Sequence, residues 1–349
     1  MKQNDEHAPM YHPLLAITTG DPAGIGPEVT LKALAGGDVY SWCRPLVLGD
    51  TRILRRAMEV TGLDQLGLRT TETVNEAAFE PGTIDVLDLG NADPQECPWG
   101  QVTPAAGRAA VEYVLRGVDL ALAGAVEGIV TAPLNKEAMQ RAGFGWAGHT
   151  ELLAERTGSE QVTMMLVNRE LRVLHVSTHV SLREAISRVT TARVLEVIRL
   201  AEQGIRDLGI ARPRIAVAGL NPHAGEHGLF GQEEIEIIGP AVEQARAAGL
   251  DVSGPLPPDT IFWRARRGEF DGVIAMYHDQ GHIPMKLLGF DEGVNVSIGL
   301  PIIRTSVDHG TAFDIAGQGI AGHESMVEAL RVAAQMVRAR RWQGPNTML

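Results

Sequence analysis

Short apolar runs alternate with helix-like stretches along almost all of the 349 residues, and this alternation most constrains the fold. Runs at 14–18, 46–48 and 128–130 are typical of buried strands. Patterns typical of helices follow at about 51–60 and 104–122. Strands that alternate with helices build folds around a largely parallel sheet. The sequence therefore predicts an α/β protein.

The second half of the chain continues the same pattern. Strand-like runs lie at 163–167, 172–177, 214–218 and 272–275, and helix-like stretches at 182–188, 191–208, 232–248 and 326–341. Asp259 is expected to cap a further, shorter helix that ends near Arg266. The first two runs form either a hairpin or two sheet strands joined by a tight loop, and their short connection favours the hairpin. No linker divides the chain, so two domains would have to be interleaved.

The charge balance limits the choice of partners. The formal net charge of −12 argues against nucleic acid and anionic membranes, which favour basic surfaces. An anionic small molecule needs only local positive charge. No apolar run approaches the roughly 20 residues that span a membrane, and the first ten residues are predicted to be a loose tail without a signal-peptide core. Cys43 and Cys97 form no motif and are not expected to pair, so a cytoplasmic location is the default expectation.

Polar side chains crowd the end of the run at 272–275. The segment that follows contains His278, Asp279, His282 and Lys286. In α/β proteins ligands bind beyond the carboxyl ends of strands, and burying polar groups is costly unless they bind something. This segment is therefore the first candidate for a ligand site.

Two further histidines, His179 and His223, also follow strand-like runs. Neutral imidazoles suit zinc and other first-row divalent ions, and three protein ligands with open positions are typical of a catalytic metal site. Any one of these histidines alone is more often an ordinary, partly buried residue. His179, His223 and His278 together favour a metal site.

Two other sets could bind anions. Thr150, in the sequence GHTE, is either a simple cap of a helix starting at Glu151 or part of an anion site at that helix terminus. Arg304 follows the apolar run at 298–303, so it is expected at a strand end, and with Lys286 and Asn295 it could bind phosphate or carboxylate. The alternative for Arg304 is an ion pair with the nearby acids Asp291 or Glu292.

Two glycine-rich segments could approach a ligand closely. The first, GDPAGIGPE at 20–28, lies between a strand and a helix but lacks the dinucleotide fingerprint GxGxxG. The second, DHGTAFDIAGQG at 308–319, has the composition of a ligand loop. A tight turn and a plain connector are the simpler interpretations of the two.

Taken together, these motifs resemble the 4-hydroxythreonine-4-phosphate dehydrogenase family of pyridoxal phosphate biosynthesis. The matching segments lie between about residues 14 and 322 and are TGDPAGIGPE, TAPLNKEA, GHTE, LNPHAGE, GLFGQEE, GPLPPDT, MYHDQG and GVNVSIGLPIIRTSVDHGTAFDIAG. The segment HGTAFDIAGQGIA is also similar to the cofactor loop of isocitrate and isopropylmalate dehydrogenases. The resemblance implies a two-domain α/β homodimer without a Rossmann domain, whose active site lies in the interdomain cleft at the dimer interface. Residues 1–135 and 297–349 would form the first domain, and residues 136–296 the second, with the dimer contact.

The resemblance also implies roles for particular residues. His179, His223 and His278 would bind one divalent cation (zinc, magnesium, manganese, cobalt or nickel), with ligands from both subunits. The proton acceptor would be Lys286 or Asp279. The implied substrate contacts are His149, Thr150, Lys286, Asn295 and Arg304, and the implied NAD contacts are Asp308, His309, Gly310, Thr311 and Asp314. The choice between NAD and NADP stays open.

One segment departs from the biosynthetic pattern, which typically reads LPVLK where this chain reads His282-Ile283-Pro284-Met285-Lys286. The variant is similar to the subgroup that acts on D-threonate or D-erythronate 4-phosphate. That similarity implies oxidation and decarboxylation of a four-carbon sugar acid phosphate to dihydroxyacetone phosphate. The alternatives are 4-hydroxy-L-threonine 4-phosphate as substrate, a dihydrodiol dicarboxylate dehydrogenase of aromatic catabolism, a non-redox metal-dependent lyase and, last, a sugar-phosphate-binding protein.

Overall fold

The computed structural model describes residues 10–289 and 293–343. The chain divides into two compact units, unit 1 up to residue 149 and from 309 onward, and unit 2 from 150 to 308. The chain passes from unit 1 to unit 2 after residue 149 and returns after residue 308, later than the boundaries at 135/136 and 296/297 expected from the sequence. Helix α4 (Lys136–Arg141) packs against α3 (Pro104–Leu122) within unit 1, and strands β11 (Val294–Ile298) and β12 (Arg304–Val307) pair within unit 2. The predicted tail before Met10, and the acids Asp291 and Glu292, lie outside the described residues.

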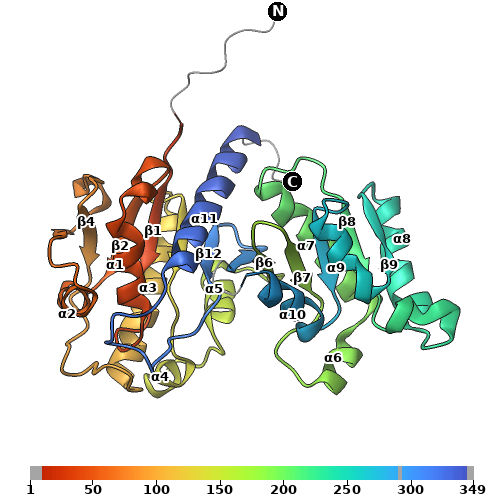
Figure 1. Ribbon diagram of the computed structural model, residues 1–349, viewed down its shortest axis with the longest axis horizontal. Helices are drawn as coiled ribbons and strands as arrows, with labels where there is room; N and C mark the ends of the chain where they lie inside the picture. Colours follow the sequence, from red (N-terminus) through yellow and green to blue (C-terminus); the bar gives the residue numbers. More distant parts are fainter. Residues whose placement is uncertain (1–9, 290–292, 344–349) are drawn as a thin grey trace, which may run out of the picture. The chain divides into compact units, whose positions relative to one another are not determined.

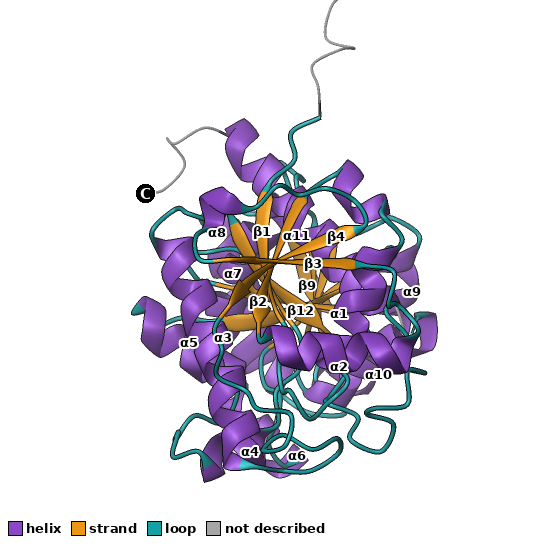
Figure 2. Cartoon of the chain, turned by 90° about the vertical axis from the view of Figure 1, so that its left-hand side faces the viewer, coloured by secondary structure: helices purple, strands orange, loops and turns teal. Residues whose placement is uncertain are grey.

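Unit 1 is built on a parallel sheet (Figure 1). Besides α3 and α4, its elements are β1 (Leu14–Thr18), α1 (Gly26–Ala35), η1 (Asp38–Ser41), β2 (Arg44–Gly49), α2 (Thr51–Thr61), β3 (Gly67–Thr71), η2 (Val74–Glu76), β4 (Thr83–Asp88), β5 (Gly128–Thr131) and α11 (Glu324–Gln343). The strand order is β3-β4-β2-β1-β5. The central strands are aliphatic and buried on both faces, as in parallel sheets covered by helices. Helices α3 and α11 both contact this sheet, and Figure 2 shows the helices around it.

Unit 2 is built on a mixed sheet. Besides β11 and β12, its elements are α5 (His149–Thr157), β6 (Thr163–Val167), β7 (Arg172–His175), α6 (Leu182–Arg188), α7 (Thr191–Asp207), β8 (Ile215–Ala218), η3 (Pro222–Gly228), η4 (Glu234–Ile238), α8 (Gly239–Ala247), β9 (Val252–Leu256), α9 (Pro258–Arg266), β10 (Gly272–Ala275) and α10 (His278–Leu288). The strand order is β12-β11-β6-β7-β10-β8-β9. Strands β7, β10, β8 and β9 are parallel, whereas β12, β11, β6 and β7 are antiparallel. Parallel neighbours end at the same edge of a sheet, so the carboxyl ends of β7, β10 and β8 lie together.

The predicted α/β class is confirmed, and so is the hairpin, since β6 and β7 pair antiparallel with Val167 opposite Arg172. The helix expected at 232–248 is present as two contiguous elements, η4, which is π-helical, and α8. Two local predictions are wrong. Asp259 lies in the first turn of α9 and does not cap it. Arg304 begins β12 and does not follow a strand, because β11 ends at Ile298 and Gly299, with a φ of 94°, turns the chain.

No helix within the described residues combines the length and the apolar character needed to cross a membrane.

Candidate active site

Four histidine rings gather where β7 and β10 end. His278, the first residue of α10, stacks on His282 with 3.6 Å between ring centroids and 9° between planes. The buried ring of His175, the last residue of β7, lies 4.7 Å from His282. The ring of His179 lies 5.5 Å from that of His278. The parallel pairing of β7 and β10 therefore brings two of the three predicted metal ligands, His179 and His278, close to each other.

His175 was not predicted as a site residue, and His282 was named only as part of the polar segment after the run at 272–275, yet the two form the inner part of this cluster. Burial, together with the neighbouring His282 and His278, lowers the pKa of His175 to about 3. Burial and His278 also lower the pKa of His282. Both rings are therefore neutral near pH 7. Nδ1 of His282 lies 3.1 Å from the carbonyl oxygen of His278, so this nitrogen carries the proton and donates it. The signal that could have identified His175 is a histidine at the end of an otherwise apolar run.

Asp279 contacts one of the predicted ligands directly. Its Oδ1 lies 2.7 Å from Nδ1 of His278, and its side chain is 72% exposed. A carboxylate at one nitrogen of a ring orients that ring and leaves the other nitrogen for a metal ion. The position of Asp279 suits orientation of His278 better than removal of a proton from a substrate.

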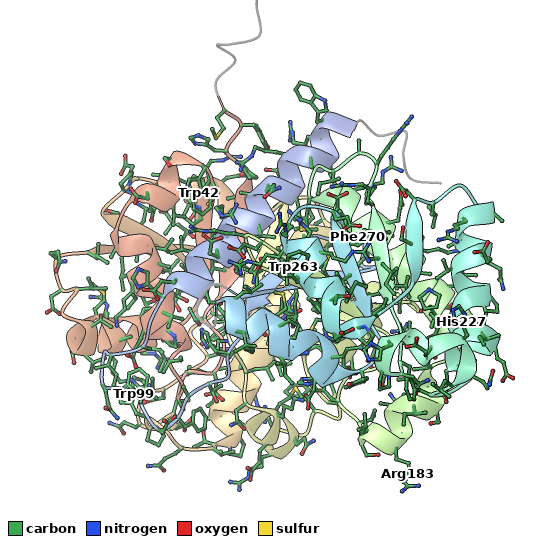
Figure 3. The ribbon with its side chains drawn as sticks, turned by 45° about the vertical axis from the view of Figure 1, so that its right-hand side comes forward. Trp42, Trp99, Arg183, His227, Trp263 and Phe270 are labelled. Atoms are coloured by element: carbon green, nitrogen blue, oxygen red, sulfur yellow. The ribbon has the colours of Figure 1, made fainter. Side chains whose placement is uncertain are left out.

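His223 lies on an unusual turn after β8. Residues 223–227 all have positive φ, between 47° and 79°, so the short helix η3 winds to the left. A left-handed helical conformation costs about 1–2 kcal/mol for each residue other than glycine. Such strain persists where the surroundings enforce it, and it clusters at functional sites. His223 is exposed on this turn, 6.4 Å from the ring of Phe230, and His227 lies on the surface of unit 2 (Figure 3).

The described residues bring together only two of the three predicted ligands. No ring contact joins His223 to His179 or His278, and no three His, Cys, Asp or Glu side chains are grouped to hold a metal ion in the described part of the chain. The donor set of two neighbouring imidazoles nonetheless fits a divalent cation. His223, the third predicted ligand, lies on the turn after β8 and has no ring contact with this pair.

A pocket of about 410 Å³ lies beside the histidine cluster in unit 2. Its lining includes Thr150 from α5, Ser177 and His179 from the loop after β7, and the cations Arg188 and Arg193. The Oγ of Ser177 is buried and has no hydrogen-bond partner among the described residues. Two arginines and several hydroxyl groups suit a small, polar, anionic ligand. Thr150 was predicted as a substrate contact, whereas Ser177, Arg188 and Arg193 were not.

The start of α5 differs from the prediction. The helix begins at His149 and not at Glu151, so Thr150 lies within its first turn and does not cap it. His149 is half-buried, and Thr150 is exposed.

Lys286 and Asp308 form an ion pair. The Nζ of Lys286 donates to Oδ2 of Asp308 at 2.6 Å and to the Asp308 carbonyl oxygen at 3.2 Å. Asp308 was predicted to bind the cofactor, but its carboxylate faces Lys286. Both side chains are only partly exposed, at 31% and 18%. The pair is therefore partly shielded from water while a ligand can still reach it.

The other predicted substrate contacts come from the antiparallel strands. Asn295 on β11 donates its amide to Sδ of Met164, which lines the pocket. Arg304 on β12 is buried and donates to Oγ of Ser297 at 3.0 Å, and burial lowers the pKa of Arg304 to about 9. Neither Arg304 nor Lys286 lines the pocket.

The two glycine-rich segments meet in unit 1. The amide of Ile25 donates to the Thr311 carbonyl oxygen at 3.0 Å, and a side chain on Gly24 would come within 2.9 Å of that oxygen. The carboxylate of Glu28 accepts hydrogen bonds from the amides of Gly317 and Gly319. The first segment therefore supports the second. The other predicted cofactor contacts on this loop are His309, Gly310 and Asp314, of which His309 contacts the Gly310 carbonyl oxygen and Asp314 is exposed.

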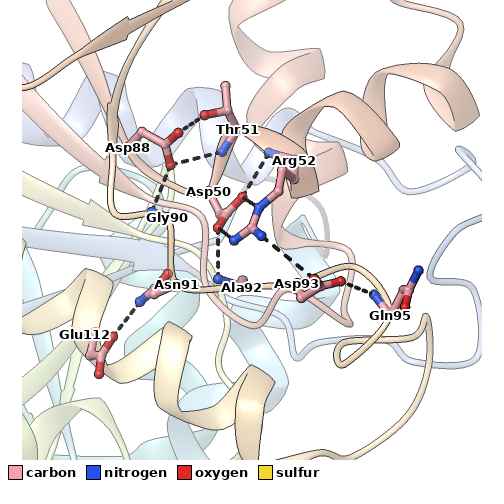
Figure 4. A network of polar contacts seen from close by, with 10 residues as sticks. All are labelled: Asp50, Thr51, Arg52, Asp88, Gly90, Asn91, Ala92, Asp93, Gln95 and Glu112. Carbon is pink, nitrogen blue, oxygen red and sulfur yellow. Dashed lines mark hydrogen bonds and ion pairs between the residues drawn. The ribbon is translucent and has the colours of Figure 1, made fainter.

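The strand ends of unit 1 hold acids that serve the backbone. Asp50, after β2, accepts from the amides of Arg52 and Ala92 at 2.9 and 2.8 Å (Figure 4). Burial alone would raise the pKa of Asp50, but hydrogen bonds from Arg52 and Ala92 hold it below its usual value. Asp88, the last residue of β4, contacts the amide and the hydroxyl group of Thr51. Asp50 caps α2 and Asp88 binds its first residue, so both carboxylates contact the backbone of unit 1.

Known proteins share this fold and sequence. The model of the family described as pyridoxal phosphate biosynthetic protein PdxA matches residues 41–333. A D-threonate 4-phosphate dehydrogenase of Cupriavidus necator is 53% identical over 331 residues, which cover 95% of this chain and 99% of that protein. A 4-hydroxythreonine-4-phosphate dehydrogenase of Desulforapulum autotrophicum is 48% identical over 323 residues, covering 92% and 95%. The crystal structure of 4-hydroxythreonine-4-phosphate dehydrogenase from Klebsiella pneumoniae is 49% identical, with a TM-score of 0.86 and coverage of 93% and 99%.

The fold and these matches identify the chain as an α/β oxidoreductase of the dehydrogenase class. The chain belongs to the pyridoxal phosphate biosynthetic protein PdxA family, because the family model covers most of its length. The family resemblance predicted from the sequence motifs is confirmed.

Proposed function

We propose that the protein is an NAD-dependent and divalent-metal-dependent dehydrogenase of D-threonate 4-phosphate. The reaction oxidises the hydroxyl group at carbon 3 and passes hydride to NAD⁺. The resulting β-keto acid loses carbon dioxide, so the products are dihydroxyacetone phosphate, carbon dioxide and NADH. D-erythronate 4-phosphate, which differs in the stereochemistry of one hydroxyl group, is a substrate of the same class.

The observation that carries this proposal is the gathering of His179 and His278 beside a pocket lined by arginines and hydroxyl groups. The substrate is an anion with a phosphate, a carboxylate and two hydroxyl groups, which matches the chemistry of that lining. Several relatives, including the one from Cupriavidus necator, carry the name D-threonate 4-phosphate dehydrogenase. That name supports the choice of the four-carbon acid phosphate over the amino acid phosphate.

The residues that would hold the cation are His179 and His278 of one subunit and His223 of a second, in a homodimer. A bound divalent cation supplies Lewis-acid chemistry, which lowers the pKa of a hydroxyl group in contact with it. Asp279 orients the His278 ring through the 2.7 Å contact with Nδ1. Stacking of His282 on His278 restricts that ring further.

Among the two candidates for proton acceptor, we assign the role to Lys286, since Asp279 is engaged with His278. Lys286 can take the hydroxyl proton only after it has released one of its own, and Asp308 at 2.6 Å is placed to receive that proton. The proton that Lys286 takes can later be returned to the carbon that loses carbon dioxide. This assignment requires the substrate hydroxyl group within hydrogen-bond reach of Nζ, directly or through one water.

Thr150, which lines the pocket, and His149, Asn295 and Arg304, which do not, are proposed from the family resemblance to bind the phosphate and the carboxylate of the substrate. The loop with His309, Gly310, Thr311 and Asp314 is proposed to contact NAD. Asp308 is reassigned to the proton transfer.

The test is NADH formation by the purified protein with D-threonate 4-phosphate, D-erythronate 4-phosphate and 4-hydroxy-L-threonine 4-phosphate, each with and without a chelator. We expect turnover of D-threonate 4-phosphate that stops with chelator and returns with added metal. Preferential turnover of the amino acid phosphate would replace the proposal with the biosynthetic activity. Absence of NADH with every substrate would favour a non-redox lyase.

A further inference from the structure

We propose that Glu234 is a positioning residue that holds His223 in place for metal binding. The inference rests on the proposed function, because it takes His223 as a metal ligand. Glu234 opens η4, eleven residues after His223 in the sequence, and its side chain points back into the loop that carries this histidine.

The carboxylate of Glu234 binds the residues that lead into the left-handed turn. Its Oε1 accepts from the amides of Leu220 and Asn221 at 2.7 and 2.8 Å. Its Oε2 accepts from the side-chain amide of Asn221 at 3.0 Å. Asn221 is the residue before η3, so these contacts fix the backbone two residues ahead of His223.

Two glycines, one before the turn and one within it, also lie close to the Glu234 carboxylate. A side chain on Gly225 would come within 2.7 Å of Oε2, and one on Gly219 within 3.0 Å of Oε1. Residues on both sides of His223 therefore lie against Glu234. Only glycine allows so close an approach at these two positions.

The buried charge of Glu234 in turn depends on the amides of this loop. The side chain is only 4% exposed, and within the part of the chain that the structure describes no lysine or arginine pairs with it. A buried carboxylate is costly unless hydrogen bonds compensate it. The amides of the loop provide that compensation, so the loop is held in the one conformation that satisfies Glu234.

This conformation places the His223 ring on the surface of a strained turn. Its φ of 53° and those of the next four residues are unfavourable for an isolated chain. Without the buried carboxylate the turn would relax, and the imidazole would leave the position from which it can bind a cation. Residues that orient a metal ligand in this way typically change metal affinity by about 10–100-fold when they are replaced.

The test compares Glu234→Ala and Glu234→Gln with Glu236→Gln, a change at an exposed glutamate two residues further along the same helix. Co²⁺ alone serves as the probe, and its affinity for the full-length protein is measured by titration calorimetry and by the visible absorption of the bound ion. Amide hydrogen exchange of residues 219–228 reports the turn itself without metal.

We expect Glu234→Ala to weaken Co²⁺ binding about 10–100-fold and to speed exchange in this segment. Glu234→Gln, which keeps one acceptor oxygen, should have a smaller effect of the same kind, and it serves as the test if the alanine variant does not fold. Glu236→Gln should match the wild type. Unchanged Co²⁺ affinity in a folded Glu234 variant would overturn the proposal.

The exchange data separate this inference from the proposed function. If the wild type binds no Co²⁺ but the Glu234 variants exchange faster, Glu234 still positions the turn and the metal assignment of the proposed function fails. If exchange in the segment does not change, the positioning role of Glu234 itself is wrong.

Discussion

The strand ends of the two units use polar residues in opposite ways. In unit 1, Asp50 and Asp88 follow β2 and end β4, and both bind backbone amides of the next loop or helix (Figure 4). In unit 2, His179, His223 and His278 follow β7, β8 and β10, and their rings remain partly or largely exposed. The acids of unit 1 and the histidines of unit 2 therefore occupy the same kind of position, at or after the end of a strand. The difference teaches that a polar residue at a strand end is available to a ligand only where the neighbouring backbone does not already bind it.

The two units also differ in how they compensate a buried carboxylate. Asp21, in the loop after β1, is fully buried, and its Oδ1 accepts the amide of Ala23 while Oδ2 has no partner among the described residues. Glu234 is also buried, but both its oxygens accept hydrogen bonds from the loop that carries His223. Asp21 is incompletely compensated inside unit 1, whereas Glu234 is fully hydrogen-bonded to a strained turn that carries a histidine. The predictions below test whether the polar residues of unit 2 serve a ligand while those of unit 1 serve the fold.

The largest effect is expected at His223. Replacement with alanine should lower Co²⁺ affinity and turnover by more than about 100-fold, beyond the range for residues that only support a ligand. His227→Ala is the matched control, because it changes another exposed histidine of the same turn. Equal loss in both variants would mean that the turn, and not the His223 imidazole, matters.

Lys286 comes next. Lys286→Met and Lys286→Arg should both lower kcat by about 10²–10⁴-fold, the usual contribution of a general acid or base. Arginine keeps the positive charge beside Asp308 but does not release its proton. Steady-state kinetics and Co²⁺ titration measure the two effects, and we expect metal affinity to be retained. Near-normal kcat in the arginine variant would show that Lys286 contributes only its positive charge and transfers no proton.

Arg304→Met should raise KM for the phosphorylated substrate about 10–100-fold, because it removes charge-assisted hydrogen bonds worth about 1.5–3 kcal/mol. The KM for NAD should change little. Parallel titrations of both substrates give the comparison. An equal rise in the two values would show that the buried guanidinium supports the fold and does not contact substrate.

The smallest effect is expected in unit 1. Burial raises the pKa of Asp21 from 3.8 to about 6, although amides of Ala23 and Asn135 oppose the shift. The folded state then binds the proton more tightly than the unfolded state, so the stability that Asp21 contributes is present below pH 3.8 and is lost as the pH rises to about 6. The slope is at most about 1.4 kcal/mol per pH unit.

Asp21→Asn should remove this slope, so it should stabilise the protein relative to wild type above pH 6 and much less near pH 4. Urea unfolding at several pH values measures the difference. A pH-independent difference between the two proteins would show that ionisation of Asp21 is not involved.

Much of the fold could be predicted because many helices and strands coincide with distinct apolar patterns in the sequence. Helix α3 and strand β6 have the bounds that periodicity indicated, and the short turn at 168–171 predicted the hairpin. The edge strands β3 and β9 were missed, because GLRTT and VSGPL carry polar residues, glycine and proline in place of an apolar pattern. Strands β11 and β12 were missed for a different reason. The apolar run at 298–303 is mostly the connection between them, and β12 itself, RTSV, is mainly polar.

The proximity of His179 and His278 could be predicted from their positions after strands, but the contacts around His223 could not. Histidines after apolar runs identified His179, His223 and His278 as candidates. Nothing local indicates that residues 223–227 adopt positive φ, because only one of the five is glycine. The role of Glu234 depends on contacts with Leu220 and Asn221, more than ten residues earlier, which no local pattern encodes.

The central claim is that imidazoles from two copies of the chain share one cation. The most direct test is anomalous diffraction from a crystal grown with cobalt. We predict one anomalous peak per site, bound by His179 and His278 of one subunit and by His223 of another. Density that places cobalt elsewhere, with these three rings apart and without metal, would contradict the account.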